Sequence, residues 1–214
     1  MKKPYRKTSA ERQKEIVQAV LRIIGEQGVT SLTTNTIAKE VGVTSGAIFR
    51  HFHSLEEIFR EVVVYAIKKI EETFPEKSLP PLERLRTFAI NRVMLFESSP
   101  GLAWLLRSEQ AYLTLPKDSV NALQKITNQS KQYILDLLEE GIGLGIIRSD
   151  IDAKSLLIPI IGTIHTMIGI PGIRKSAGYK KTEVEQALLA LERMLLSPNH
   201  LDRKPQLNNQ FKKE

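Results

Sequence analysis

The 214-residue sequence contains no cysteine, which excludes disulfide bonds, thiolate metal sites and a cysteine nucleophile. It has only 12 glycines and 10 prolines, and most of them stand where segments join. No run of alternating apolar and polar residues indicates a strand, whereas apolar residues recur repeatedly at helical spacing. The sequence therefore predicts an all-α fold, and the recurring stripes correspond to about nine helices.

Signatures of catalysis are also missing. There is no glycine-rich phosphate loop and no Glu-x-x-His pair of the kind that holds metals in helical bundles, and the 4 histidines show no metal-ligand spacing. We therefore expect a protein that is not an enzyme and that holds neither a metal nor a cofactor. A catalytic site assembled only in space would leave no such signature.

A leader and a membrane span are not evident either. The basic N-terminus is not followed by an apolar run, so we expect no signal peptide. Residues 155–173 carry no charged side chain and approach the length of a membrane span. Pro159, His165 and Pro171 interrupt this stretch, and a helix that is buried on every face has the same pattern. We favour the buried helix and expect no membrane partner.

Positive charge is present and unevenly distributed. Residues 1–70 carry 12 Lys and Arg against 7 Asp and Glu, which is most of the net charge of +7. Such a concentration favours a phosphate-bearing partner, although many basic proteins bind no nucleic acid. Residues 1–8 form a basic arm that would reach DNA or remain a solvated tail, and residues 201–214 have the composition of a polar tail.

Within this basic third, residues 33–52 predict a helix-turn-helix. Ile37 and Ala38 begin an apolar helical stripe, and Gly42 stands where a helix ends in a left-handed residue. The spacing from Ala38 through Gly42 to Ile48 is that of a helix-turn-helix, in which the close crossing leaves room only for a small residue. An ordinary corner between two helices is the alternative interpretation.

The second helix of this motif would present polar side chains to a DNA groove. Its N-terminal residues are those that reach base edges in such motifs. The start of the preceding helix offers hydroxyl and amide groups to a phosphate, unless these groups only cap the helix. The candidate DNA-binding residues are Thr33, Thr34, Thr44, Ser45, Gly46, Phe49, Arg50, His51 and His53.

Capping signals predict where other helices begin. Asp152 has the character of an N-cap, Thr44 or Ser45 would cap the second helix of the motif, and residues 113–116 have the composition of a loop. Three capping boxes are predicted, pairing Thr8 with Glu11, Ser54 with Glu57 and Thr182 with Glu185.

Residues 71–200 would form a larger helical region with room for a small molecule. Aromatic and polar side chains lie near its apolar stripes, although core packing explains the same spacing. His165 would be either a hydrogen-bonded core or interface histidine or a ligand contact. The candidate lining residues are Phe88, Arg92, Phe96, Trp104, Arg107, Tyr112, Tyr133, His165 and Met167.

The N-terminal third resembles the DNA-binding domain of the TetR/AcrR family of bacterial transcription regulators. The resemblance is carried by the apolar stripe at residues 16–28 and by residues 32–59, LTTNTIAKEVGVTSGAIFRHFHSLEEIF. It implies a three-helix DNA-binding domain at residues 10–70 and a ligand-binding and dimerisation domain at residues 71–200. It also implies a homodimer formed through helices at residues 152–170 and 182–196.

The resemblance further implies a cytoplasmic, ligand-responsive repressor that binds double-stranded DNA at a palindromic operator and responds to an unknown small-molecule effector. Two alternatives remain. One is a DNA-binding protein of the same fold whose second region binds another protein, and the other is a helical carrier or enzyme whose motif is only a corner.

Two positions depart from the family pattern. The family often has Tyr where this chain has Phe49, and usually has Lys where this chain has Leu55. Both substitutions remove a phosphate contact that relatives would make. We expect Arg50, His51, His53 and the basic arm to supply part of the missing anchoring.

Overall fold

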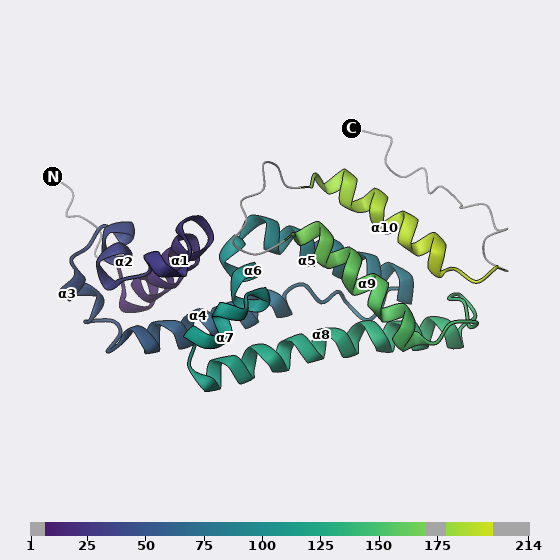
Figure 1. The fold of residues 1–214 in the computed structure, drawn as a ribbon, viewed down its shortest axis with the longest axis horizontal. Helices are drawn as coiled ribbons and strands as arrows, with labels where there is room; N and C mark the ends of the chain where they lie inside the picture. Colours follow the sequence, from purple (N-terminus) through teal and green to yellow (C-terminus); the bar gives the residue numbers. More distant parts are fainter. Residues whose placement is uncertain (1–6, 170–178, 199–214) are drawn as a thin grey trace.

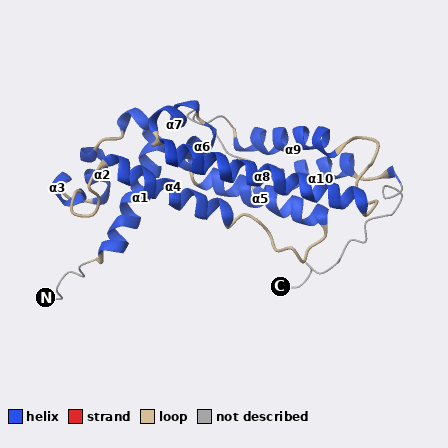
Figure 2. Cartoon of the chain, turned by 90° about the horizontal axis from the view of Figure 1, so that it is seen from below, coloured by secondary structure: helices blue, strands red, loops and turns tan. Residues whose placement is uncertain are grey.

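The computed structural model describes residues 7–169 and 179–198. Within these ranges it is all-α with no strand, as expected, and it has ten α-helices and a short 3-10 helix where about nine helices were predicted (Figures 1 and 2). The helices are α1 (Ser9–Gln27), η1 (Val29–Ser31), α2 (Thr34–Val41), α3 (Ser45–Ile48), α4 (Leu55–Glu71), α5 (Pro81–Ser98), α6 (Pro100–Arg107), α7 (Glu109–Thr114), α8 (Lys117–Gly143), α9 (Ala153–Ile168) and α10 (Lys181–Leu195).

The molecule is elongated, with α1, α2 and α3 at one end (Figure 1). At the other end α5, α8, α9 and α10 pack against one another. Helix α4 joins the two ends, because it packs on α1 near the first and on α8 toward the second. The buried apolar side chains of both ends belong to one continuous cluster.

Helix α7 is the one that the sequence analysis missed, since residues 113–116 were expected to form a loop. This helix has only six residues, which is too short for a periodic stripe to stand out. Its conformation is stabilised by packing, because Ala111 and the following Leu115 are buried. Most of the predicted basic arm (residues 1–6) and all of the predicted polar tail (residues 201–214) lie outside the described residues.

The predicted caps are correct at two helices. At α1 the Glu11 N–H donates to Thr8 Oγ1 over 3.2 Å, and the Thr8 N–H donates back to Glu11 Oε2 over 2.7 Å. At α9 the Ser155 N–H donates to Asp152 Oδ1 over 3.0 Å. These bonds satisfy amides that a helix start leaves without partners.

The other two capping boxes differ from the expectation. Ser54 accepts from the Glu57 N–H over 3.1 Å, but Glu57 Oε2 accepts from the His53 N–H over 2.5 Å and not from Ser54. Helix α10 begins before Thr182, which is exposed inside its first turn, and the Lys180 N–H donates to Glu183 Oε2 over 2.8 Å. In both cases the glutamate carboxylate accepts a hydrogen bond from the backbone N–H of a residue that precedes the helix.

Helix α9 contains most of the uncharged stretch and is not buried on every face. Ile160 and Ile164 face the core, but Ile158 is 73% exposed. No helix in the described ranges has both the length and the apolar character that crossing a membrane requires.

The backbones of α1 and α6 are in direct contact. A Cβ atom at Gly101 would overlap the carbonyl group of Leu21, and a Cβ atom at Gly25 would lie 2.9 Å from the Gly101 nitrogen. Helix α6 therefore depends on glycine to lie against α1. Leu102 and Leu105, which follow Gly101 in α6, are buried in the apolar core.

We predict that Gly101→Ala lowers the free energy of unfolding by about 1–3 kcal/mol, because the added methyl group forces the two backbones apart. Chemical denaturation measures the change. Gly143→Ala is the matched control, since a Cβ atom at this helical position meets nothing within 4 Å. That variant should match the parent or gain up to about 1 kcal/mol. Equal stability of the two variants would contradict the close contact.

Candidate functional site

The helix-turn-helix predicted at residues 33–52 is present. Helix α2 ends at Gly42, which has a φ of 70° in the left-handed region. The Val43 N–H donates to Ala38 O over 2.9 Å and the Gly42 N–H to Lys39 O over 3.3 Å, which is the usual glycine-terminated helix end. Ala38 and Ile48 are both buried at the crossing. The small residue therefore allows α3 to pack closely on α2.

Helix α3 is short, and its start is held differently from the expectation. Thr44 occupies the N-cap position, but its side chain makes no capping hydrogen bond. Ser45 does not cap the helix either, because its hydroxyl bonds to Asn35 Oδ1 in α2. The turn residues that follow α3 are fixed by backbone bonds such as the one from the His51 N–H to Ile48 O, 2.9 Å long.

Most candidate DNA-binding residues are solvent-exposed on these two helices and their flanks. Arg50 is exposed, and its guanidinium has no ion-pair or hydrogen-bond partner among the described residues. A Cβ atom at Gly46 would meet nothing within 4 Å, so packing does not require glycine there. The exposed members are Thr33, Thr44, Gly46, Phe49, Arg50 and His53, and the half-buried ones are Thr34, Ser45 and His51.

His51 and Thr33 have structural partners within the domain. His51 Nδ1 lies 3.0 Å from Ser9 Oγ, and its carbonyl accepts from Gln13 Nε2 over 3.0 Å, so this residue ties the end of the motif to α1. Thr33 accepts from the Thr36 N–H over 3.1 Å and therefore caps α2. These bonds do not prevent the exposed atoms of either residue from meeting a phosphate.

The two departures from the family pattern have different surroundings. Phe49 is 51% exposed at the end of α3. Leu55 is half-buried and packs against the core, beside a groove that it shares with Phe59, Thr114 and Pro116. An apolar residue is therefore explained by packing at Leu55, whereas nothing in the structure explains Phe49.

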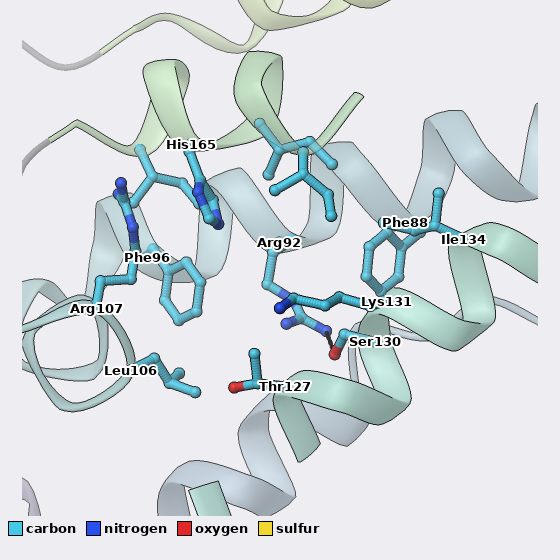
Figure 3. A pocket seen from close by; sticks show the side chains of 13 residues that line it. Phe88, Arg92, Phe96, Leu106, Arg107, Thr127, Ser130, Lys131, Ile134 and His165 are labelled. Carbon is cyan, nitrogen blue, oxygen red and sulfur yellow. Dashed lines mark hydrogen bonds between the residues drawn. The ribbon is translucent and has the colours of Figure 1, made fainter. Parts of the chain in front are cut away.

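A cavity of about 320 Å³ lies among α5, α6, α8 and α9 (Figure 3). This volume is at the lower end of the roughly 300–1,000 Å³ typical of small-molecule sites. Of the predicted lining residues, the cavity includes Phe88, Arg92, Phe96, Arg107 and His165. The sequence analysis missed Leu106, Thr127, Ser130, Lys131, Ile134, Ile161, Ile164 and Ile168.

The other four predicted lining residues lie elsewhere. Trp104 is buried in α6, and Tyr112 is half-buried on α7. Tyr133 packs on Phe74 and Phe88, with ring centroids 5.0 and 5.4 Å apart, respectively. Met167 borders a separate groove between α9 and α10. Helical spacing correctly identified these residues as apolar-face positions, but it could not distinguish the cavity side from the core side.

Arg92 is the most unusual residue of the cavity, because it is a buried cation. Its Nε donates to Thr73 Oγ1 over 3.0 Å, and its Nη2 donates to Ser130 Oγ over 3.3 Å. The guanidinium carbon lies 4.7 Å from the ring centroid of Phe88 and 5.9 Å from that of Phe96. Burial lowers the pKa of Arg92 to about 10, so the side chain is still positively charged at neutral pH.

Further basic groups line the same cavity. Arg107 Nη1 donates to Gly169 O at the end of α9, and burial lowers its pKa. Lys131 is exposed and has no ion-pair partner among the described residues. Partial burial, followed by the positive charges of Arg107 and Lys131, lowers the pKa of His165. None of the lining residues is acidic.

A second exposed surface lies on α9 and α10. Both helices carry exposed large apolar side chains, namely Ile158, Leu189 and Met194. Between the helices lies a groove whose lining includes small and apolar residues such as Pro159, Gly162 and Ala187, and the polar residues Thr163, Thr166 and Glu183. Exposed apolar surface of this kind is typical of a protein–protein contact.

Comparisons with known proteins agree on one family. A family model described as bacterial regulatory proteins of the tetR family matches residues 16–62. The fatty acid metabolism regulator protein of Bacillus subtilis (strain 168) is 30% identical over 161 residues, and the match covers 72% of this chain and 80% of that protein.

Two further proteins match over most of their length. The nucleoid occlusion factor SlmA of Vibrio atlanticus (strain LGP32) is 27% identical over 192 residues, covering 85% of this chain and 94% of that protein. The solved structure of AibR in complex with isovaleryl coenzyme A and operator DNA is 20% identical. It superposes with a TM-score of 0.69 over 87% of this chain and 99% of that chain, which shows a shared fold.

Proposed function

The chain belongs to the TetR family of bacterial regulatory proteins, and we propose that it is a ligand-responsive transcriptional repressor that binds a palindromic operator as a homodimer. The family is one of DNA-binding regulators and not of enzymes. One observation carries the finer proposal: a single chain combines an exposed helix-turn-helix, which packs on α1, with a ligand-sized cavity that α6 helps to line. Helix α1 packs in turn on α4 and α6, and Arg92 in the cavity donates to Thr73 just beyond α4.

In this proposal each subunit inserts α3 into a major groove. Thr44, Ser45 and Gly46 at the start of α3 would reach base edges, while Arg50 and the N-terminus of α2 would bind phosphates. Arg50 suits this role because its guanidinium has no partner among the described residues. A two-fold dimer requires half-sites about 34–36 Å apart, or a multiple of that distance.

The dimer would form through α9 and α10, whose exposed apolar residues would then become buried. This arrangement explains why α9 has no charged residue beyond its first turn. It also explains why Ile158 is exposed when a single subunit is considered alone. Burying the groove between the two helices would bring two copies of the same surface together, as a two-fold axis requires.

Ligand binding would reach the DNA-binding helices by two physical routes. Arg92 in the cavity donates to Thr73, which follows the end of α4. Leu106 and Arg107 line the cavity from α6, whose Gly101 lies against α1. A ligand that prefers one arrangement of these helices would shift the spacing of the two reading heads, and one without such a preference would shift nothing. We expect α4 to be the element that moves.

The match to a nucleoid occlusion factor supports a second candidate function. In that case the chain would bind DNA in the same way, and its second region would bind another protein without small-molecule induction. The cavity of about 320 Å³ favours the ligand-responsive proposal. Release of DNA by a small molecule would separate the two candidates.

We predict that Arg50→Ala weakens binding to an operator selected from a random-sequence duplex library. Removing one phosphate contact should reduce the salt slope by about 1 per half-site. Deletion of residues 1–7 should act in the same direction if the basic arm binds phosphate. Fluorescence anisotropy at several salt concentrations measures both effects.

Lys77→Ala is the matched control for this experiment. It removes one positive charge from an exposed side chain that has no ion-pair partner among the described residues, in the segment between α4 and α5 at the end of α4 away from α3. Affinity and salt slope should then match those of the parent. If Arg50→Ala and the deletion both behave like this control, the proposed phosphate contacts are wrong.

We predict that Ile158→Glu converts the dimer to a monomer, because it introduces a charge into an apolar interface that must exclude water. Sedimentation velocity measures the change in mass. Leu113→Glu is the control, since Leu113 is an exposed apolar residue on α7, outside the proposed interface. A dimer that survives Ile158→Glu, or a parent that is already monomeric, would contradict this interface.

A further inference from the structure

We propose that the ligand of the cavity is an anionic amphiphile, with one compact apolar body and one negatively charged head group that Arg92 and its basic neighbours receive. The inference rests on the proposed function, because it takes the cavity to be the effector site. It adds the charge and the shape that the effector must have.

The charge of Arg92 is not neutralised within the described part of the chain. Its two hydrogen bonds go to the hydroxyl groups of Thr73 and Ser130, and neither hydroxyl carries a charge. The rings of Phe74, Phe88 and Phe96 lie around the guanidinium. These groups hold the guanidinium in place, but buried cations are normally paired with an acid. An anionic ligand would supply the missing partner.

Donor groups of Arg92 are also available for such a ligand. A guanidinium has five N–H groups, and the protein uses one on Nε and one on Nη2. Nη1 has no hydrogen-bond partner in the described residues, and it is not fully buried. It is therefore accessible from the cavity, where Figure 3 shows the guanidinium beside Lys131 and Ser130. Such a fork matches a carboxylate or a phosphate.

The other residues that line the cavity disfavour a positively charged ligand. Arg107 and Lys131 add positive charge on two other helices, and no acidic residue lines the cavity. A cationic ligand would be repelled, and a neutral ligand would leave the Arg92 charge without a partner. The remaining walls are aromatic and aliphatic, with Phe96, Ile134 and Ile164 from three helices. They fit a compact hydrocarbon body.

Two sources share this chemistry. One is a free carboxylic acid whose carboxylate binds Arg92. The other is the coenzyme A thioester of the same acid, whose phosphates would bind outside the cavity near the exposed Lys131. Its thioester group is neutral and could only accept a hydrogen bond from Arg92, so the free acid alone pairs the Arg92 charge directly. Both have an apolar body and a negative head group, so the experiment must compare them directly.

Isothermal titration calorimetry of the full-length protein with four probes of equal chain length tests the proposal. The probes are octanoate, octanoyl-CoA, octan-1-ol and octylamine, and coenzyme A alone is the control for head-group binding. We expect at least one of the two anionic probes to bind at least tenfold more tightly than octan-1-ol, and octylamine to bind most weakly. Equal or tighter binding of the alcohol or the amine, or no binding of either anion, would overturn the inference.

Variants then identify which cation receives the head group. Arg92→Gln should weaken octanoate binding tenfold or more, and Lys131→Gln should weaken octanoyl-CoA binding more than octanoate binding. Lys131 is exposed and makes no ion pair in the described residues, so its variant tests the charge even if Arg92→Gln unfolds. Arg86→Gln is the control, because Arg86 lies on α5 outside the cavity and pairs with Glu192. Parent-like affinities for both cavity variants would refute the assignment.

The effect on DNA separates this inference from the proposed function. If an anionic probe binds but leaves the affinity for the selected operator unchanged, the charge assignment holds and ligand responsiveness fails. If octan-1-ol releases the operator and the anions do not, the protein is ligand-responsive and the charge assignment is wrong.

Discussion

The contact between α1 and α6 depends on Gly101, because any side chain there would overlap the backbone of Leu21. Helix α2 packs on α1 and α3 packs on α2, and α6 ends at two residues that line the cavity. A rigid contact between two helix backbones leaves little room for them to slide independently. A displacement of α6 by a ligand would therefore be passed to α1, and with it to the helix-turn-helix.

Arg92 connects the same cavity to α4 by a different kind of interaction. Its hydrogen bonds reach Thr73, just beyond α4, and Ser130 in the middle of α8. At its other end α4 is tied to the start of α8, where Arg60 Nε donates to Asp118 Oδ2 over 2.8 Å. That ion pair is exposed and contributes little stability, so the packing of α4 on α8 is what holds the two helices together. In the proposed function, the buried cation would therefore link the charge of a bound ligand to the helix that follows the helix-turn-helix.

Local signals made much of the fold predictable from the sequence. Thr8 with Glu11, Asp152 and Gly42 act within one turn of a helix, so their residue types were sufficient to predict the helix ends there. The six residues of α7 could not be predicted, because their helix depends on burial of Ala111. Most of the cavity lining was missed for a similar reason: spacing on α8 marks Thr127, Ser130 and Ile134 as one face, but only the fold shows that this face meets α5 and α9.

The account's central claim is that occupancy of the cavity changes the separation of the two DNA-reading heads. The absence of cysteine allows a single spin label to be placed in each subunit by Lys39→Cys, at an exposed position of α2. Double electron–electron resonance would then measure the distance between the two labels in the dimer, without ligand and at saturation with the more tightly binding anionic probe. The account predicts a shifted distance distribution upon saturation; an unchanged distribution, with the probe bound, would contradict it.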